Sequence, residues 1–394
     1  MCLGGNCLKI IYVAGCVSQG AYARLYGRPD ARPVFQAQKY NRLFVEGLSA
    51  HTQVEVVGYP PADVGAMENG VIDLPDETVE QVRYHYIRTY RRPLRRWLHV
   101  GASSFFKCLR LLDKDSVVMI DCLNQMSGLG ALLASKVRGC RCVGVITDLP
   151  EFLGGGLTMA LSEFLIRHST DYVVLTKAMN DYVNRKEKPY VVLEGHADIT
   201  MEKQVPSLDK KGKKRICLYA GSIHKLYGIQ RLVEGFLLAN IADAQLHIYG
   251  IGDYQQELEE IAAREPSIHY GGLLLPSQVV EKEMEATLLL NPRPSDEKYV
   301  AYSFPSKTME YMSTGTPVLT TALPCLPEEY KPYLYFIREE TPQGIGDALR
   351  QTLSHSDEEL FERGCQARRF VLEQRNNVVQ AAKVLAMLEG DGKA

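Results

Sequence analysis

Residues 215–250, RICLYAGSIHKLYGIQRLVEGFLLANIADAQLHIYG, contain the pattern that decides the fold. An apolar run at 215–221 ends in glycine, an amphipathic segment follows at 228–239, and a second apolar run occupies 245–250. Short apolar runs separated by amphipathic segments predict parallel strands joined by helices. The stretch therefore predicts a β-α-β unit whose helix packs on a parallel sheet.

The same alternation extends along the chain in both directions. Before residue 199 it predicts strands at 8–14, 52–60, 116–121, 141–150, 172–176 and 190–195, and helices at 35–50, 127–137 and 177–186. After residue 250 it predicts helices at 253–264, 276–285 and 305–315, and strands near 267–272, 286–293 and 316–321. Asp253 is expected to cap the helix that it begins, and residues 356–388 are expected to form a long polar terminal helix.

A polar stretch at 199–214 interrupts the alternation. It has few apolar residues and is rich in lysine, as expected of a connection between domains. We therefore expect a first Rossmann-like domain over 1–198, a junction over 199–214 and a second Rossmann-like domain over 215–372. A C-terminal helix within 373–394 is expected to cross back to the first domain.

Composition narrows the class of protein. The 394 residues suffice for two α/β domains, and 46% hydrophobic residues indicate packed cores. A net charge of −2 disfavours nucleic-acid binding, which needs a basic surface. The 10 cysteines form no Cys-x-x-Cys pair and no zinc spacing, so reduced thiols in a cytoplasmic protein are expected. The apolar run at 8–14 is too short for a signal peptide or a membrane span.

Residues 291–321, NPRPSDEKYVAYSFPSKTMEYMSTGTPVLTT, carry the most informative chemistry. A strand ends near Arg293, a polar loop follows, and a helix begins near Pro305. The first amides of a helix lack internal partners and lie at the positive end of its dipole, so a diphosphate can bind there. The loop and first turn add two hydroxyls and a cation, from Ser303, Ser306 and Lys307.

Glu310 lies three residues after Lys307 and has two interpretations. A carboxylate at that depth can accept two hydrogen bonds from a ribose diol. Alternatively, Glu310 forms a surface ion pair with Lys307, because residues three apart share one side of a helix. The spacing alone does not separate the two.

This segment resembles the donor-binding signature of the retaining glycosyltransferases called group 1, or family 4. The family's Glu-x7-Glu pair is followed by a Gly-x-Pro-Val strand, and Glu310 and Gly315–Val318 match its second glutamate and its strand. The resemblance assigns Glu310 to the nucleotide ribose. Tyr302 stands where the family has its first glutamate, and this YSFPSK form resembles capsule and exopolysaccharide enzymes. The implied architecture is the α/β GT-B fold, with two Rossmann-like doubly wound domains facing a central cleft.

Two further segments, 218–236 and 247–253, resemble the glycine-rich turns of the same family. The family's arginine and lysine facing the donor diphosphate are replaced here by Ser222 and Tyr227. We expect Lys307, with Arg293 or Lys225, to supply the missing positive charge; a solvated loop lysine is an equally compatible interpretation of Lys225. The implied donor-binding residues are Gly221, Ser222, Lys225, Tyr249, Gly250, Tyr302, Ser303, Ser306 and Glu310.

The resemblance implies a hexosyltransferase-like reaction with retention at the anomeric carbon. The nucleotide sugar, UDP- or GDP-linked, is the co-substrate, and no other cofactor or metal is expected. No pair of carboxylates suited to glycoside hydrolysis is evident. A front-face mechanism, in which the departing phosphate assists deprotonation of the acceptor, is therefore expected. Lys307 and Arg293 would stabilise that phosphate.

The first half offers weaker candidates for the acceptor side. Asp148, in VGVITDLPE at 143–151, follows a strand end and could orient an acceptor hydroxyl, or it could cap the turn before Pro150. The turn GCVSQGAY at 15–22 could admit a ligand closely or be an ordinary β-α turn. The acceptor is expected to be a saccharide or a lipid-linked saccharide, in surface polysaccharide biosynthesis.

Residues 91–112, RRPLRRWLHVGASSFFKCLRLL, mix basic, aromatic and aliphatic side chains. Such a segment suits peripheral contact with an anionic membrane, which would place the protein on the inner face of the cell membrane. The alternative is an amphipathic helix packed on the sheet with its arginines facing outward.

Two other functions remain open from sequence. One is a sugar-nucleotide epimerase, an enzyme class that shares this fold. The other is a non-catalytic subunit that binds sugar nucleotides, which is suggested by Ser222, Tyr227 and Tyr302 at positions where the family carries charged residues.

Overall fold

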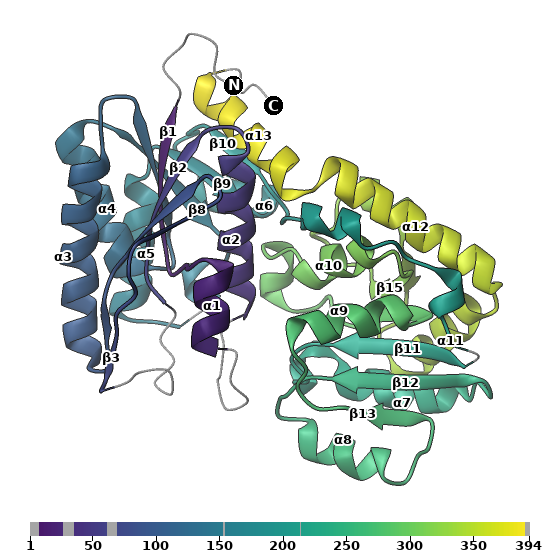
Figure 1. Cartoon of the computed structure of the whole chain (residues 1–394). Coiled ribbons are helices and arrows are strands. Elements are labelled where there is room, and N and C mark those ends of the chain that lie inside the picture. The colour runs from purple at the N-terminus through teal and green to yellow at the C-terminus, as the bar shows by residue number, and fades with distance from the viewer. Residues whose placement is uncertain (1–7, 27–34, 61–68, 153, 213, 391–394) are drawn as a thin grey trace. The chain divides into compact units, whose positions relative to one another are not determined.

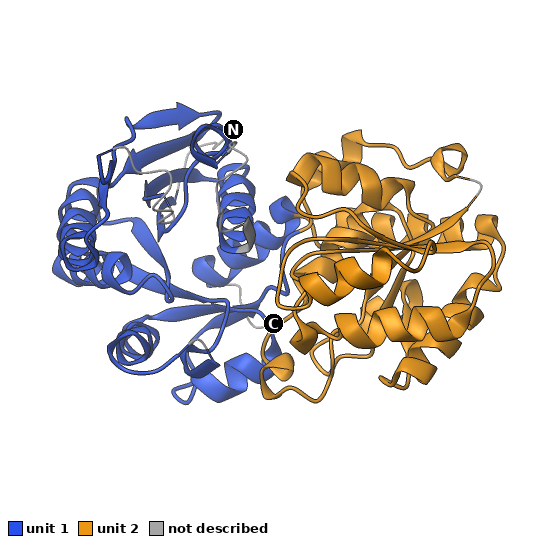
Figure 2. Cartoon of the chain, turned by 90° about the horizontal axis from the view of Figure 1, so that it is seen from below, with its two compact units in different colours: residues 1–196, 377–394 blue, residues 197–376 orange. Residues whose placement is uncertain are grey.

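The computed structural model describes residues 8–26, 35–60, 69–152, 154–212 and 214–390. The chain forms two compact units: Met1–His196 with Asn377–Ala394, and Ala197–Asn376 (Figure 2). The second unit thus begins at Ala197 and includes the stretch 199–214, which the sequence suggested as a separate junction. Residues 213 and 391–394 of the predicted junction and C-terminal helix lie outside the described residues.

The first unit is built on an eight-stranded sheet in the order β10-β9-β8-β7-β1-β2-β5-β4 (Figure 1). Its strands are parallel except β4, which pairs antiparallel with β5. The strands are β1 (Lys9–Ala14), β2 (Gln53–Gly58), β4 (Glu77–Val79), β5 (Val82–Tyr86), β7 (Ser116–Asp121), β8 (Arg141–Ile146), β9 (Asp171–Val174) and β10 (Tyr190–Val192), with a small antiparallel pair β3 (Val71–Ile72) and β6 (Thr89–Tyr90).

Helices cover the sheet because its central strands bury both of their faces. β7 is buried at every position, and β1 at all but its first residue. The helices of this unit are α1 (Gln19–Tyr26), α2 (Phe35–Ser49), α3 (Pro93–Leu111), α4 (Gln125–Arg138), α5 (Leu157–His168), α6 (Lys177–Val183) and α13 (Asn377–Glu389), with a 3-10 turn η2 (Pro150–Phe152).

The C-terminal helix α13 belongs to the first unit and packs beside α2 (Figure 1). Gly47 of α2 makes this possible, because a Cβ there would lie 2.1 Å from the Asn377 carbonyl oxygen. The Asn377 side chain donates to the Leu43 carbonyl at 3.1 Å, and Arg141 donates to the Leu388 carbonyl at 2.6 Å.

The second unit has a six-stranded, fully parallel sheet in the order β13-β12-β11-β14-β15-β16. Its strands are β11 (Arg215–Ala220), β12 (Ala244–Tyr249), β13 (Ile268–Tyr270), β14 (Leu288–Asn291), β15 (Val318–Thr321) and β16 (Tyr335–Ile337). Its helices are α7 (Ile229–Ala239), α8 (Gln255–Ala262), α9 (Pro276–Glu285), α10 (Ser306–Thr314), α11 (Pro342–Leu353) and α12 (Asp357–Gln374), with 3-10 turns η3 (Ile199–Lys203), η4 (Leu208–Lys210), η5 (Lys225–Tyr227), η6 (Lys298–Ala301) and η7 (Glu328–Tyr333).

The long terminal helix expected over 356–388 is instead two helices, α12 and α13. Between them Asn376 forms a β-bridge with Ala197, whose amide donates to the Arg375 carbonyl at 3.0 Å. The backbone groups that would continue the helix are thus bonded to another segment, and the chain passes from one unit to the other at this break.

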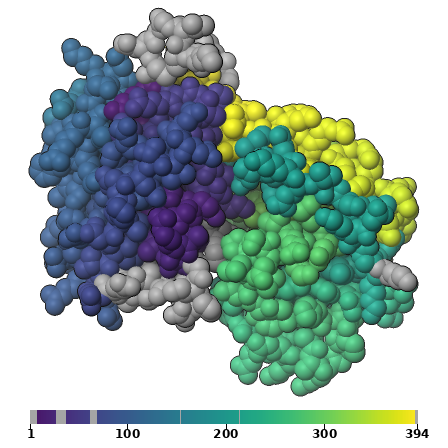
Figure 3. Space-filling view, viewed as in Figure 1, coloured from purple at the N-terminus to yellow at the C-terminus, as the bar shows by residue number. Residues whose placement is uncertain are grey.

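Helix α12 fixes the start of the second unit. Its buried Arg368 donates to the carbonyls of Met201, Gln204 and Ser313. Figure 3 shows α12, in yellow, against the teal segment that includes η3 and η4. Arg368 thereby ties this segment to the end of α10.

The described part of the chain has two further features. The eight cysteines within the described residues are free thiols. In the same part of the chain, none of the helices has the length and apolar character needed to cross a bilayer.

Candidate functional site

The second unit changes the direction of its strand order between β11 and β14. β11 leads to β12 on one side, and its other neighbour β14 leads to β15 on the opposite side. In doubly wound sheets ligands bind at such a switch point, beyond the carboxyl ends of the strands. The residues that follow β11 and β14, namely Gly221, Ser222 and Arg293, therefore lie at the expected position.

Two glycines allow the strand ends to come unusually close. A Cβ at Gly250 would lie 1.8 Å from the Gly221 carbonyl oxygen, and one at Gly221 would lie 1.8 Å from the Lys307 Nζ. Both glycines also have positive φ angles, 135° and 151°. The Gly221 amide donates to the Tyr249 carbonyl at 2.9 Å, so the two turns are bonded as well as adjacent. No larger residue fits at either position without displacing its neighbours.

Lys307 places a cation at this edge. It stands in the first turn of α10, and its Nζ donates to the Ala220 carbonyl at 2.7 Å and lies 5.4 Å from the centre of the Tyr219 ring. The Tyr311 hydroxyl, one turn later, accepts from the Ala220 amide at 3.0 Å. The start of α10 is thus joined to the end of β11, and the half-buried lysine is held at the switch point.

The carboxyl end of β14 positions the same helix. The Asn291 side chain donates to the Thr308 hydroxyl at 3.2 Å, which holds the first turn of α10 at this edge. Glu310, one turn beyond Lys307, is half-buried rather than fully exposed. In the preceding loop Tyr302 and Ser303 are half-buried, and Ser306 is exposed.

Arg293 brings a second cation. Its guanidinium carbon lies 4.7 Å from the centre of the Tyr299 ring. Its Nε is buried and has no hydrogen-bond partner among the residues that the structure describes. Burial raises the pKa of Tyr299, and the neighbouring arginine opposes that rise. Arg293 thus carries a buried donor just beyond β14.

Lys225 has a different environment. Its Nζ pairs with Glu257 at 2.5 Å, and both side chains are about half exposed. The Lys225 amide donates to the Asp253 carboxylate at 2.9 Å, and this bond is the main cause of a lowered Asp253 pKa. The predicted helix cap at Asp253 is therefore wrong: α8 begins at Gln255, and Asp253 binds the η5 turn instead.

Tyr249 ends β12 beside this region and is buried. Its ring fills the space next to Gly271, where a Cβ would lie 2.2 Å from the ring. The rings of His247 and His269 are 4.9 Å apart on the neighbouring strands. The Tyr249 ring therefore packs in the interior, at the end of the strand that leads to Gly250.

The first unit has a corresponding switch point between β1 and β7. Here the Gly15 amide donates to the Asn124 side-chain oxygen at 3.1 Å, and the Tyr59 hydroxyl donates to the same oxygen at 2.6 Å. The Asn124 amide group donates in turn to Asp121. Sequence reasoning identified the turn at 15–22 but missed Tyr59, Asp121 and Asn124; the polar residues directly after the 116–121 strand were the available signal.

Asp121 is a buried carboxyl group at the end of β7. Burial raises its pKa, opposed by hydrogen bonds from the Leu123 amide, Asn41 and Asn124. Asn41 also accepts from the Tyr12 hydroxyl at 2.6 Å. Asp148 lies in the loop between β8 and η2, half-buried. The structure thus gathers Gly221, Gly250 and Lys307 in the second unit, whereas Asp148 belongs to the first.

Comparison with known proteins supports this architecture. Residues 214–355 match the family described as "Glycosyl transferases group 1". No curated protein matches the chain.

Three solved structures illustrate the fold. The sucrose-phosphate synthase (tll1590) from Thermosynechococcus elongatus has a TM-score of 0.67 and 15% identity over 97% of this chain and 98% of its own. The lipopolysaccharide outer core galactosyltransferase WaaB, in its apo form, has a TM-score of 0.61 and 16% identity, over 97% of this chain and 99% of its own. Alr3699/HepE from Anabaena, in complex with UDP, has a TM-score of 0.61 and 13% identity, over 97% of this chain and 99% of its own.

These similarities confirm the expected GT-B fold, with two Rossmann-like units. The family match covers β11 to α11, which includes Gly221, Gly250, Lys307 and Glu310. Residues 214–355 are therefore similar to the glycosyl transferases group 1 family, within a chain that has the GT-B fold.

Proposed function

We propose that this protein transfers a sugar from a nucleotide-sugar donor to a saccharide or lipid-linked saccharide acceptor, with retention of anomeric configuration. The observation that carries the proposal is the position of Lys307, held against the glycine-lined ends of β11 and β12 in the unit that matches the glycosyltransferase family. Structures of HepE with UDP and with UDP-glucose support a nucleotide-sugar donor for a protein of this fold.

Departure of the nucleotide diphosphate leaves negative charge that the site must stabilise. In the proposal the Lys307 ammonium and the first amides of α10 bind the diphosphate, because a cation and a helix N-terminus both favour an anion. Arg293, with its buried Nε, adds a second donor. The bond from Lys307 to Ala220 fixes where the charge lies before the donor binds.

Glu310 is assigned to the ribose. It lies one turn farther along α10 than Lys307 and is half-buried, so its carboxylate can accept from both ribose hydroxyls while the lysine binds the phosphates. Tyr302 replaces the carboxylate that the family has near the sugar, so we assign deprotonation of the acceptor to the departing phosphate. Neutralisation of the phosphates is assigned to Lys307, Arg293 and backbone amides rather than to a metal ion.

A transfer assay tests this proposal. The full-length protein is incubated with a panel of UDP- and GDP-sugars and with saccharide and lipid-linked acceptors, and products are identified by mass spectrometry and NMR. We expect one donor to be consumed only when an acceptor is present, with the α or β configuration of the donor kept. Epimerised donor formed without any acceptor, or donor that binds and is never consumed, would overturn the proposal.

We also propose peripheral contact with a membrane through α3. Leu94, Leu98 and Phe106 are 72%, 62% and 59% exposed, and they follow one side of the helix at spacings of four and eight residues. Arg91, Arg92 and Arg95 are also exposed at its start. The buried residues of α3 pack on α4, where a Cβ at Gly130 would lie 2.3 Å from the Gly101 carbonyl. Apolar groups beside arginines match an anionic membrane surface.

Sedimentation with liposomes tests the membrane contact. Wild type should sediment with vesicles that contain anionic lipid, and a variant with Arg91, Arg92, Arg95 and Arg96 replaced by serine should remain in solution. A variant with exposed leucines 94 and 98 replaced by serine should also lose binding. Equal sedimentation of all three proteins would contradict the proposed contact.

A further inference from the structure

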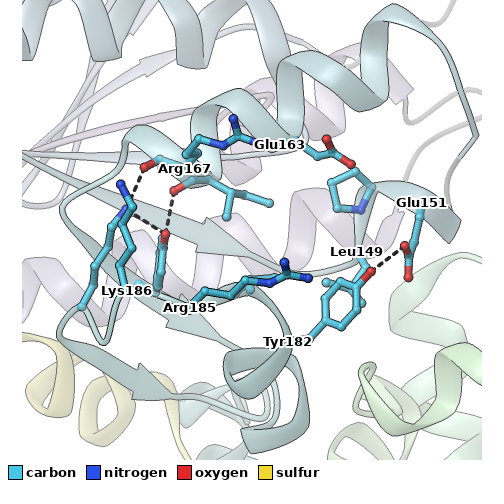
Figure 4. A pocket seen from close by; sticks show the side chains of 12 residues that line it. Leu149, Glu151, Glu163, Arg167, Tyr182, Arg185 and Lys186 are labelled. Atoms are coloured by element: carbon cyan, nitrogen blue, oxygen red, sulfur yellow. Dashed lines mark hydrogen bonds between the residues drawn. The ribbon is translucent and has the colours of Figure 1, made fainter.

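A cavity of about 350 Å³ lies within the first unit, beside α5, α6 and the loop that follows α6 (Figure 4). Leu149 and Ile166, which are buried, contribute apolar surface to it. Its other lining residues include four cations and two carboxylates, which gives a formal excess of two positive charges: Arg167, Arg185, Lys186 and Lys188, with Glu151 and Glu163. Pockets of this size with a few charged groups suit a small ligand.

One of the cations, Lys188, already has a structural role. Its Nζ donates to the Arg167 carbonyl at 2.8 Å, the Ser169 carbonyl at 2.7 Å and the Tyr172 hydroxyl at 2.9 Å. An ammonium group has three N–H donors, so these bonds use all of them. Lys188 therefore shapes the wall of the cavity and leaves ligand binding to the other cations.

The loop that bears two of those cations is locked in place. The Asn184 side chain accepts from the Lys188 amide and donates to the Lys188 carbonyl, both at 2.8 Å. It also donates to the Asn180 side chain at 3.0 Å. Arg185 and Lys186 lie between these anchored ends, so their backbone positions are fixed before any ligand binds.

The side chains of Arg167, Arg185 and Lys186 are exposed and make no hydrogen bond or ion pair within the described ranges of the chain. Figure 4 shows the Arg185 side chain extending across the cavity between α5 and Tyr182. The Glu151 carboxylate, in contrast, accepts from the Tyr182 hydroxyl at 2.8 Å. The cations are thus available, and one of the two carboxylates already has a partner.

We propose that this cavity binds the phosphate or diphosphate group of a ligand. Two arginines and a lysine come from separate elements, α5 and the loop after α6, onto one cavity, which favours an anion with several oxygens. The planar arginine groups can each donate two hydrogen bonds to such oxygens. The anchored loop fixes the backbone positions of Arg185 and Lys186 around the anion. Leu149 and Ile166 form the apolar part of the cavity wall.

The cavity lies in the first unit, the half of the chain that holds the acceptor-side candidates of the sequence. One assignment rests on the proposed function: the bound group is a phosphate carried by the acceptor. Such a group can belong to a soluble sugar phosphate or to a lipid diphosphate. The two sources share the chemistry that Arg167, Arg185 and Lys186 recognise, and they differ in whether a lipid tail adds affinity.

Residue-level footprinting of the full-length protein tests the site. Lys186 is acetylated and Arg167 and Arg185 are modified with phenylglyoxal, with and without inorganic pyrophosphate, and the modification of each residue is measured by mass spectrometry. We expect pyrophosphate to protect all three residues, and sodium chloride at the same ionic strength to leave them reactive. Because the readout belongs to these residues, pyrophosphate bound in the second unit does not affect the result.

A double variant and its matched control follow. In Arg167→Gln/Arg185→Gln, protection of Lys186 should require at least about tenfold more pyrophosphate, because charge-assisted hydrogen bonds are lost. Arg83→Gln/Lys136→Gln removes two exposed charges of the same unit away from the cavity and should behave as wild type. No protection in wild type, or equal protection in both double variants, would overturn the phosphate site.

Farnesyl diphosphate, used in place of pyrophosphate, identifies the source. Protection at similar concentrations indicates recognition of the phosphates alone, and protection at much lower concentrations indicates a lipid-linked ligand. Sugar transfer without any protection by pyrophosphate would refute this inference and leave the proposed function standing. Protection without sugar transfer to any acceptor would refute the proposed function and leave the phosphate site standing.

Discussion

The two switch points of this molecule have the same topology and opposite contents. In the second unit, between β11 and β14, glycines leave the strand ends free of side chains and Lys307 places a positive charge there. In the first unit, between β1 and β7, the side chain of Asn124 fills the corresponding place and bonds Gly15 and Tyr59, with the buried Asp121 behind it.

Under the proposed function, this difference matches two kinds of ligand. An edge of bare backbone with a cation suits an anionic diphosphate, because nothing must move for its oxygens to approach. An edge closed by a neutral amide offers hydrogen bonds without positive charge, which suits hydroxyl groups. We therefore interpret the second unit as the donor side and the first as the acceptor side.

Replacement of Lys307 should have the largest effect. In Lys307→Ala the charge that stabilises the departing diphosphate is lost, and we expect kcat for sugar transfer to fall by about 10²–10³-fold, as when one preorganised transition-state donor is removed. Steady-state kinetics with the donor found in the transfer assay measures this. Lys331→Ala, which removes an exposed lysine paired with Glu328, is the matched control and should keep the wild-type rate.

Gly250→Ala should have the next largest effect. The new Cβ would collide with the Gly221 carbonyl in a left-handed backbone conformation, so we expect a loss of about 2–3 kcal/mol in unfolding free energy and weaker nucleotide binding. Thermal unfolding measures the first quantity. Gly272→Ala shares the positive φ but has open space around its Cβ, and it should lose clearly less stability. Equal losses would mean that the close approach of the two turns has no energetic importance.

Asn124→Ala tests the switch point of the first unit, between β1 and β7. The Gly15 amide and the Tyr59 hydroxyl lose their shared acceptor, which should cost about 1–3 kcal/mol of unfolding free energy. Nucleotide affinity should stay at the wild-type value, since the donor side lies in the second unit. A variant that loses nucleotide affinity while keeping its stability would contradict the division into donor and acceptor sides.

The last prediction concerns His196 and is a pH dependence of stability. Its ring lies beside Tyr40 and Phe44, and its two nitrogens are buried and lack hydrogen-bond partners among the described residues. Burial lowers its pKa from 6.5 to about 3, so between these values the unfolded chain binds a proton that the folded chain does not. Stability should therefore fall as pH falls below about 6.5, by at most about 1.4 kcal/mol per pH unit.

Denaturant titrations of wild type and His196→Phe between pH 7 and pH 4 measure this contribution. The difference in unfolding free energy between the two proteins should shift in favour of the phenylalanine variant as the pH falls. A difference that stays constant with pH would show that His196 is protonated equally in the folded and unfolded states.

Sequence reasoning identified much of the fold because the local signals are strong. The strand at 116–121 and the helix at 276–285 have the bounds that the apolar pattern predicts. The same local signals identified Gly221, Gly250 and Lys307 in the sequence, because each lies in a short motif directly after a strand or at the start of a helix. The assignment of Glu310 depends on the family resemblance, because its spacing from Lys307 fits a surface ion pair equally well.

The remaining features depend on contacts between distant residues. Asn124 acts on Gly15, 109 positions away, and the apolar pattern carries no trace of that pairing. Asp253 was interpreted as a helix cap because the residues after it favour a helix. Its carboxylate instead accepts a hydrogen bond from the Lys225 amide. The break between α12 and α13 likewise arises from Ala197, which binds the backbone that a continuous helix would have used.

Calorimetric titration of wild type and Glu310→Ala with UDP and GDP tests the central claim most directly. We expect one of the two nucleotides to bind the wild type and the variant to bind it about ten- to a hundredfold more weakly, because the hydrogen bonds to the ribose are lost. The unfolding temperature of the variant should be unchanged. Identical affinities for the two proteins, or binding of neither nucleotide to the wild type, would contradict it.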